Sequence, residues 1–132
     1  MKRAISVLLA VTMGGNGLVM LVAGGWWYGA VPGVPETGPL NPHFVKDIGA
    51  AYLVVGLAFA WLAARTGPMA LGAAQAAAAF LSLHGLIHLT EAIGDANGLA
   101  HLTRDFAAVI LPALLAIWVA WPARAKMELS HA

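Results

Sequence analysis

Four apolar runs, each long enough to cross a bilayer, constrain this chain more than any other feature. A membrane-spanning helix needs about 20 mostly apolar residues, and such runs lie at about residues 4–25, 44–64, 69–93 and 106–121. Only 10% of the 132 residues are charged, whereas a soluble domain carries roughly 25%. We therefore expect an all-α integral membrane protein, in which residues 1–132 form a single transmembrane domain built as a four-helix bundle.

The basic residues predict the direction in which the spans run. If the spans alternate, five of the seven Lys and Arg residues lie on one side of the membrane: Lys2, Arg3, Arg65, Arg124 and Lys126. Basic residues mark the cytoplasmic side, so both termini should be cytoplasmic. The first run is longer than the roughly 7–15 residues of a secretory signal core, which favours a retained span. We expect a multi-pass protein of a bacterial inner (cytoplasmic) membrane.

Two short patterns occur twice, in the same order. HFVKD at residues 43–47 lies at the entry to the second run and HLTRD at residues 101–105 at the entry to the fourth, while NGLVML at residues 16–21 resembles HGLIHL at residues 84–89. We therefore predict two repeated helical hairpins, related by a pseudo-two-fold axis along the membrane normal. A GGNG stretch inside the first run has small residues that predict close packing against a neighbouring helix.

Four ionisable residues near the end of the third run share one helical face: His84, His88, Glu91 and Asp95. Their i, i+4, i+7, i+11 spacing forms a stripe, which we expect to point into the bundle because lipid offers it no partners. Two His residues at i and i+4 can ligate one metal ion, with Glu91 as a third ligand or as a carboxylate that orients a His. The alternative interpretation is hydrogen bonding between packed helices.

The two repeated elements each place an Asp one helical turn after a His, as His43 with Asp47 and His101 with Asp105. In the functional interpretation, both pairs approach across the pseudo-axis and join the stripe of the third run, because a His oriented by a carboxylate is a typical metal ligand. In the structural interpretation, the pairs cap helices and anchor them at the membrane interface.

The residues around these pairs predict local structure. Asn41 and Pro42 are typical of a helix start, which puts His43 in the first turn of the second helix. Thr103 is a candidate cap for the fourth helix. Arg104 either extends to the lipid headgroups or pairs with a carboxylate at the end of the third run.

The candidate metal ligands are the imidazoles and carboxylates of these groups: His84, His88, Glu91, His43, Asp47, His101 and Asp105. The chain has no cysteine, which excludes disulfides, thiolate metal sites and iron–sulfur clusters. The cofactor that this set favours is a divalent metal ion. Haem is less favoured, because it needs a deep axial His, often two from facing helices, and the counterpart of His84 in the repeat is Asn16.

The stretch VPGVPETGPLNPHFVKDIGAAYL, at residues 31–53, resembles sequences of small four-span proteins of bacterial inner membranes that have no assigned function. The plan of four short spans is similar to that of the DoxX-like group. Proteins of that group are linked to quinone-connected oxidoreductases, so the resemblance implies a redox role among the alternatives. It transfers no site residues, since no motif in this chain is specific enough.

Three classes of function remain open. The first is a binding protein that holds a divalent metal ion or a small polar ligand near the extracytoplasmic face. The second is a non-catalytic accessory subunit of a larger membrane complex, and the third is a metal- or quinone-linked membrane oxidoreductase. The expected partners are the lipid bilayer and either a second copy, as a homodimer, or a larger membrane complex. A net charge of +1 gives no indication of nucleic-acid binding.

Overall fold

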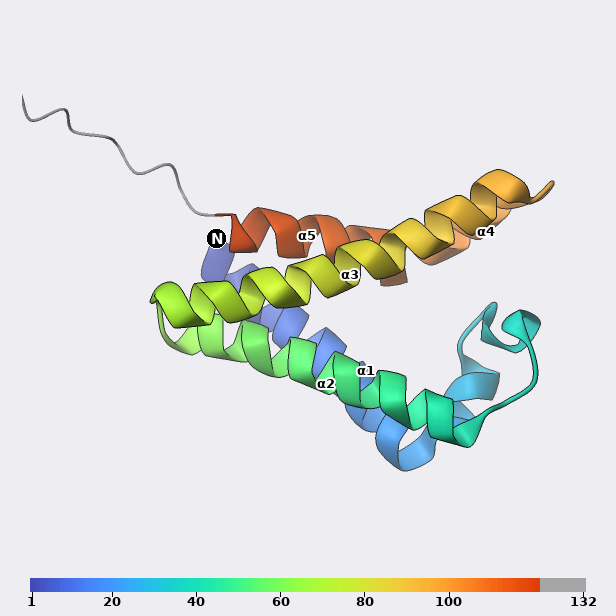
Figure 1. The fold of residues 1–132 in the computed structure, drawn as a ribbon, viewed down its shortest axis with the longest axis horizontal. Helices are drawn as coiled ribbons and strands as arrows, with labels where there is room; N and C mark the ends of the chain where they lie inside the picture. Colours follow the sequence, from blue (N-terminus) through green and yellow to red (C-terminus); the bar gives the residue numbers. More distant parts are fainter. Residues whose placement is uncertain (122–132) are drawn as a thin grey trace, which may run out of the picture.

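The computed structural model describes residues 1–121 of the chain, and the regular elements of this part are all helices. Helix α1 spans Lys2–Ala30, α2 spans Pro42–Ala64 and α3 spans Pro68–Gly94. The fourth helical stretch consists of α4 (Gly98–Asp105), a π-helical turn η2 (Phe106–Ile110) and α5 (Leu111–Ala120). A short 3-10 helix, η1 (Val34–Thr37), lies between α1 and α2 (Figure 1).

Four helical stretches are long and apolar enough to cross a membrane: Lys2–Ala30, Pro42–Ala64, Pro68–Gly94 and Gly98–Ala120. This confirms the prediction of four long apolar helices. The first stretch continues past residue 25 and the fourth begins well before residue 106, because the helices include polar and glycine-rich turns that lower the local hydropathy. Two basic residues used to predict orientation, Arg124 and Lys126, lie outside the described residues.

Helix α1 bends near its C-terminal end. Ala23 has non-helical dihedral angles, φ −138° and ψ 39°, directly before Gly24 and Gly25, and paired small residues are a common cause of kinks. The indole N–H of Trp27 donates to Asn16 Oδ1 at 2.8 Å, although a straight helix would separate these residues by about 16 Å along its axis. The bend therefore turns the last part of α1 back towards the middle of the molecule.

Helices α1 and α2 cross at glycine residues. A Cβ atom at Gly17 would lie 2.5 Å from the carbonyl oxygen of Gly49 and 2.5 Å from the backbone nitrogen of Leu53. A Cβ atom at Gly56 would lie 2.5 Å from the Cα atom of Gly14. Real Cβ contacts are essentially never this short, so glycine is what allows the two backbones to approach. The close packing predicted from the GGNG stretch is confirmed.

The helices form two hairpins. Hairpin 1 consists of α1 and α2, and hairpin 2 consists of α3 with α4, η2 and α5. The hairpins contact each other through α2 with α3 and through α1 with α5, whereas the backbone of α4 approaches neither α1 nor α2. We call the end at the connection 65–67 the turn end, and the opposite end, with η1, the loop end. Figure 1 shows the hairpins close together at the turn end and apart at the loop end.

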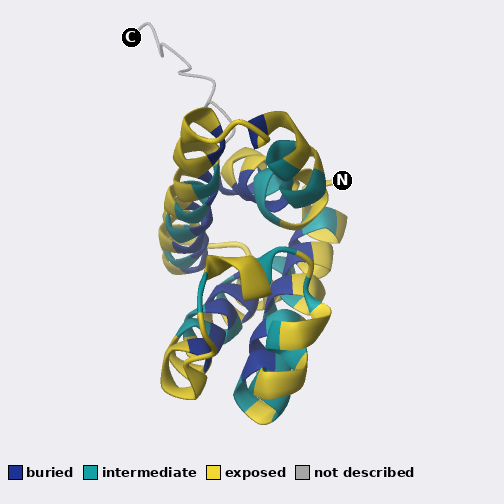
Figure 2. Cartoon of the chain, turned by 90° about the vertical axis from the view of Figure 1, so that its right-hand side faces the viewer, coloured by how far each residue is buried: buried dark blue, intermediate teal, exposed yellow. Residues whose placement is uncertain are grey.

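The core lies between the helices and consists mainly of aliphatic and small side chains. Tyr52 and Phe59 of α2 belong to the same buried cluster as Leu9 of α1, Leu81 of α3 and Ala116 of α5. Buried residues face the inside of the bundle and exposed ones face outwards (Figure 2). Many of the exposed side chains are large and apolar, which is typical of a surface that contacts lipid.

Candidate functional site

His88 and Asp105 form the central contact of the loop end. His88 lies on α3, Asp105 is the last residue of α4, and His88 Nδ1 lies 2.8 Å from Asp105 Oδ2. The side chain of His88 is 26% exposed and that of Asp105 is 12% exposed, so the contact is largely shielded. A carboxylate acceptor favours the imidazole tautomer with its proton on Nδ1, which leaves the lone pair of Nε2 free.

The π-helical turn η2 follows Asp105 directly. The backbone N–H of Leu111 donates to the carbonyl oxygen of Phe106, five positions earlier, and Pro112 in the next position has no N–H to donate. Single π turns inside α-helices occur frequently at functional sites. The direction of Asp105 relative to α5 therefore depends on this turn.

Arg104 connects Asp105 to the segment that contains η1. Its Nε donates to Asp105 Oδ1 at 2.8 Å, and one of its terminal nitrogens donates to Glu36 Oε2 at 2.9 Å. The expectation that Arg104 pairs with a carboxylate of the third run is wrong, because these two acceptors engage the guanidinium. Its extension to the lipid headgroups stays a prediction. The guanidinium also packs against Gly33, which has a φ of +86° and where a Cβ atom would overlap the guanidinium.

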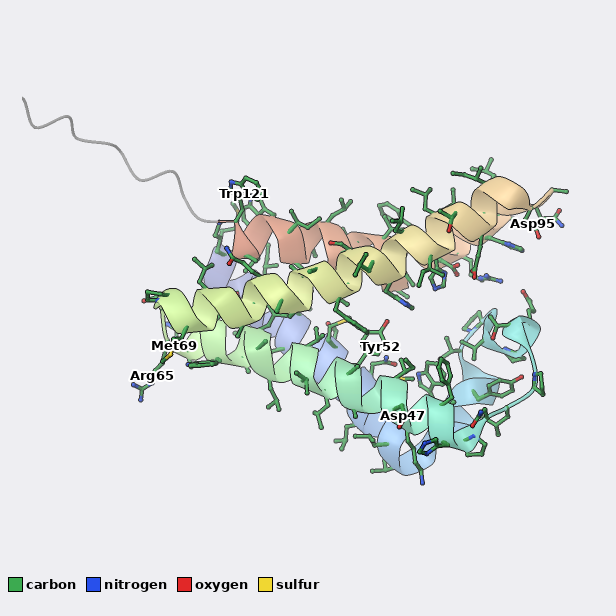
Figure 3. All side chains as sticks on the ribbon, in the orientation of Figure 1. Asp47, Tyr52, Arg65, Met69, Asp95 and Trp121 are labelled. Carbon is green, nitrogen blue, oxygen red and sulfur yellow. The ribbon has the colours of Figure 1, made fainter. Side chains whose placement is uncertain are left out.

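His84 lies one turn away from His88 on α3, among aromatic rings. Its ring centroid is 4.8 Å from that of His88 and 5.8 Å from that of Tyr52, and its ring stacks on Phe80 at 6.4 Å. Tyr52 is 8% exposed and points from α2 towards α3 (Figure 3). Within residues 1–121, Nδ1 of His88 is the one nitrogen of the two imidazoles that has a hydrogen-bond partner.

Glu91 and Asp95, the two members of the stripe nearest the loop end, do not point into the bundle as His84 and His88 do. Glu91 is exposed on α3. Asp95 follows α3 and accepts a hydrogen bond from the backbone N–H of Asn97 at 2.6 Å. The expectation that the whole stripe points into the bundle is therefore wrong beyond His88, because the hairpins diverge at the loop end and leave this part of α3 uncovered.

The two His–Asp pairs of the repeated elements do not meet. His43 Nε2 lies 3.5 Å from Asp47 Oδ2 on the surface of α2, with side chains that are 88% and 59% exposed. His101 is half-buried on α4. Asp105 bonds to His88 of the stripe instead of pairing with His101. The expected convergence of both pairs is wrong, because α2 and α4 do not contact each other in the described part of the chain.

The local predictions around these pairs have mixed outcomes. The side-chain oxygen of Asn41 accepts from the backbone N–H groups two and three positions later, at 3.1 Å each, and Pro42 lies in the first turn. The predicted start of α2 is thus confirmed. Thr103 lies inside α4, where its hydroxyl donates to the carbonyl oxygen of Leu99. Its interpretation as a cap is wrong, because α4 already begins at Gly98.

We call the connected side chains at the loop end the histidine cluster: His84, His88, Asp105, Arg104 and Glu36. The histidine cluster offers few metal ligands, but its charges suit a cation. Within residues 1–121, no group of three or more His, Asp or Glu side chains is arranged to hold a metal ion. A metal bound between the imidazoles of His84 and His88 would therefore take its other ligands from solvent. Asp105 and Glu36 are negative and Arg104 is positive, so the charges of these three bonded side chains sum to one negative charge.

Sequence reasoning identifies neither Glu36 as part of this cluster nor Gly33 and Tyr52 as its neighbours. Glu36 lies 68 positions from Arg104, in a connection rich in Gly and Pro, and no local pattern indicates the pairing. Tyr52 lies in an apolar run, where an aromatic residue is typical of the core. The i, i+4 spacing of His84 and His88 is the part of the site that the sequence does predict.

The comparisons with known proteins add no relative. No protein-family model matches the chain, and no curated protein or solved structure is significantly similar to it. The resemblance to the DoxX-like group stays a prediction, and the function is inferred from the geometry of the cluster.

Proposed function

We propose that this chain is a membrane-embedded binding protein in which His84 and His88 hold a divalent transition-metal ion at the loop end. The observation that carries the proposal is the 2.8 Å contact between His88 Nδ1 and Asp105 Oδ2. A metal-ligating His typically donates its second ring N–H to a carboxylate, which fixes the orientation of the ring and raises the basicity of the ligating nitrogen. The contact with Asp105 would prepare Nε2 of His88 for this role by leaving its lone pair free.

The neighbouring imidazole would supply the second ligand. His84 and His88 lie one turn apart on α3, with ring centroids 4.8 Å apart, and two His at i and i+4 bind Zn²⁺ in helical sites. Imidazole suits Zn²⁺, Cu²⁺ and Ni²⁺, and the net negative charge of the cluster attracts a cation. Water or a small anion would complete the coordination, which makes this an open site rather than a closed structural one.

We further propose that the loop end faces the extracytoplasmic side of a bacterial inner membrane. The support is the distribution of basic residues: Lys2, Arg3 and Arg65 lie at the turn end, against Lys46 and Arg104 towards the loop end. The positive-inside rule then makes the turn end cytoplasmic. The internal repeat is part of the same proposal, and it is supported by the common plan of the hairpins, each with a connection at the loop end.

The test is metal binding by the full-length protein, purified in mild detergent without chelator. Elemental content is measured before and after Zn²⁺ is offered, and the affinity is obtained by competition with a chromogenic chelator. We expect near-stoichiometric Zn²⁺ in the wild type, loss of binding in His84→Ala and His88→Ala, and an affinity about 10–100-fold lower in Asp105→Asn. The matched control is His43→Ala, which removes the exposed His of another i, i+4 His–Asp pair and should leave binding unchanged.

Several results would contradict this proposal. A wild-type protein that holds no metal before or after the addition of Zn²⁺ would refute it. Equal losses in His43→Ala and His88→Ala would mean that the binding is a general property of surface imidazoles. A Soret band in the visible spectrum would identify haem instead, and a metal-free protein that retains a stoichiometric partner would favour an accessory subunit.

A further inference from the structure

The side chain of Arg104 joins hairpin 2 to the connection between α1 and α2 at the loop end. We call residues 31–41, which connect α1 to α2 and include η1, the cap segment. In the described part of the chain, its hydrogen bond to hairpin 2 comes from Arg104, which donates to Glu36 Oε2 at 2.9 Å and packs against Gly33. The backbone of η1 approaches α1 and no element of hairpin 2. Without the ion pair to Glu36, the cap segment would keep its hydrogen bonds to hairpin 1 and lose its hydrogen bond to hairpin 2.

The cap segment is held firmly on its own side. The hydroxyl of Tyr28 donates to the carbonyl oxygens of Pro35 and Gly38, at 3.4 and 2.5 Å. The hydroxyl of Thr37 donates to the carbonyl oxygen of Val34 at 2.8 Å. The bend in α1 turns its last residues, and Tyr28 with them, towards the middle of the molecule. The cap segment should therefore move together with the end of α1, and its position relative to hairpin 2 depends on Arg104.

Arg104 also belongs to the histidine cluster. The guanidinium that holds Glu36 also donates to Asp105, and Asp105 in turn holds His88. A continuous series of contacts thus runs from the cap segment to the imidazoles. The ion pair at its outer end is partly exposed, 30% at Arg104 and 68% at Glu36. Exposed ion pairs are weak, so this one can separate without the unfolding of a helix.

We propose that the cap segment is a latch over the His84–His88 site. With Glu36 on Arg104 the cap segment is held beside the histidine cluster and His88 is 26% exposed, and when this ion pair separates, solvent and cations reach the imidazoles more readily. The ion pair also adds the carboxylate of Glu36 to the charges around a bound cation, so the paired state should retain the cation longer. The identity of the ligand rests on the proposed function, whereas the existence of the latch does not.

The test measures how fast a small reagent reaches each imidazole. Diethyl pyrocarbonate modifies the free ring nitrogen of neutral His, and peptide mass spectrometry gives a separate rate for each His of the full-length protein in nanodiscs. We expect Glu36→Gln to raise the rates at His84 and His88 by about two- to fivefold, the range expected from loss of an exposed ion pair. Glu36→Lys, which places two positive charges together, should raise them further.

The chain offers both an internal reference and a matched control. His43 is 88% exposed on the surface of α2, so its rate should be the same in every variant. Asp95→Asn removes another exposed carboxylate at the loop end, one that does not bond to Arg104, and should leave the rates at His84 and His88 unchanged. A rise in Asp95→Asn equal to that in Glu36→Gln would overturn the latch, because any loss of negative charge would then suffice.

Two further outcomes separate the latch from the metal site. Equal rates at His84 and His88 in the wild type, Glu36→Gln and Glu36→Lys would overturn the latch, whatever the effect of metal. Repeating the measurement with saturating Zn²⁺ tests the proposed function, because bound Zn²⁺ should protect both imidazoles in the wild type. Rates that depend on Glu36 but not on Zn²⁺ would support the latch and refute the metal site.

Discussion

Replacement of Gly17 by Ala tests the packing on which hairpin 1 depends. An ideal Cβ at this position would lie 2.5 Å from both the carbonyl oxygen of Gly49 and the backbone nitrogen of Leu53. Cβ contacts essentially never fall below 3.0 Å, so α1 and α2 would have to separate by at least the difference, about 0.5 Å, at their crossing. Neither contacted atom can move alone, because both belong to the backbone of α2.

The cost of this separation should be large for a single methyl group. Overpacking a well-packed contact costs about 1–3 kcal/mol, in part because a gap of about 0.5–1 Å loses a quarter to a half of the dispersion attraction between facing atoms. A cost of about 2 kcal/mol raises the equilibrium constant for unfolding about 30-fold, since about 1.4 kcal/mol corresponds to a factor of ten. Gly15→Ala is the matched comparison, because a Cβ there meets nothing within 4 Å.

The assay is unfolding of the detergent-solubilised protein by rising mole fractions of sodium dodecyl sulfate, followed by tryptophan fluorescence. Gly17→Ala should unfold at a clearly lower mole fraction than the wild type. Gly15→Ala should unfold at the same fraction or a higher one, because Ala favours a helix over Gly by up to about 1 kcal/mol. If the two variants unfold together, the helices do not cross at Gly17 and the reasoning is refuted.

Two further predictions concern the ends of the helices. Asn41→Ala removes the side-chain acceptor of the first N–H groups of α2 and should lower the stability of the helix by about 1 kcal/mol. Hydrogen exchange in that turn should become faster, and Asn41→Ser should restore the protection. Unchanged exchange in the Ala variant would contradict the cap. Because the chain has no cysteine, single cysteines at Thr66 and Ala96 report on each end separately. An impermeant maleimide added to spheroplasts should label position 96 and spare position 66, and the reverse pattern would invert the proposed topology.

The features that could be predicted from the sequence are those with a local physical cause. Four long apolar helices follow from hydropathy, because the length of an apolar run is a property of consecutive residues. The start of α2 follows from Asn41 and Pro42, whose chemistry acts within one helical turn. The close crossing of α1 with α2 follows from the glycines of its GGNG stretch, because small residues let helix backbones approach in a membrane.

The features that could not be predicted depend on residues distant in sequence. Arg104 and Glu36 lie 68 positions apart, and their pairing requires the bend in α1 as well as the direction of α4. The start of the fourth helical stretch at Gly98 is hidden by the polar residues that follow it, which lower hydropathy without breaking the helix. The His and Asp spacing of HLTRD predicts a pair within α4, whereas the tertiary fold brings Asp105 to His88.

The π-helical turn η2 makes the histidine cluster sensitive to chain length. A π turn holds one residue more than an α-helical turn between its bonded groups, and one residue corresponds to a rotation of about 100° about the helix axis. Helices α4 and α5 are therefore out of phase with a single continuous α-helix. Deleting one residue within Phe106–Ile110 would restore that phase and rotate Asp105 away from His88, although every residue of the cluster would still be present. The cluster thus depends on the number of residues between α4 and α5 as much as on the identity of its side chains.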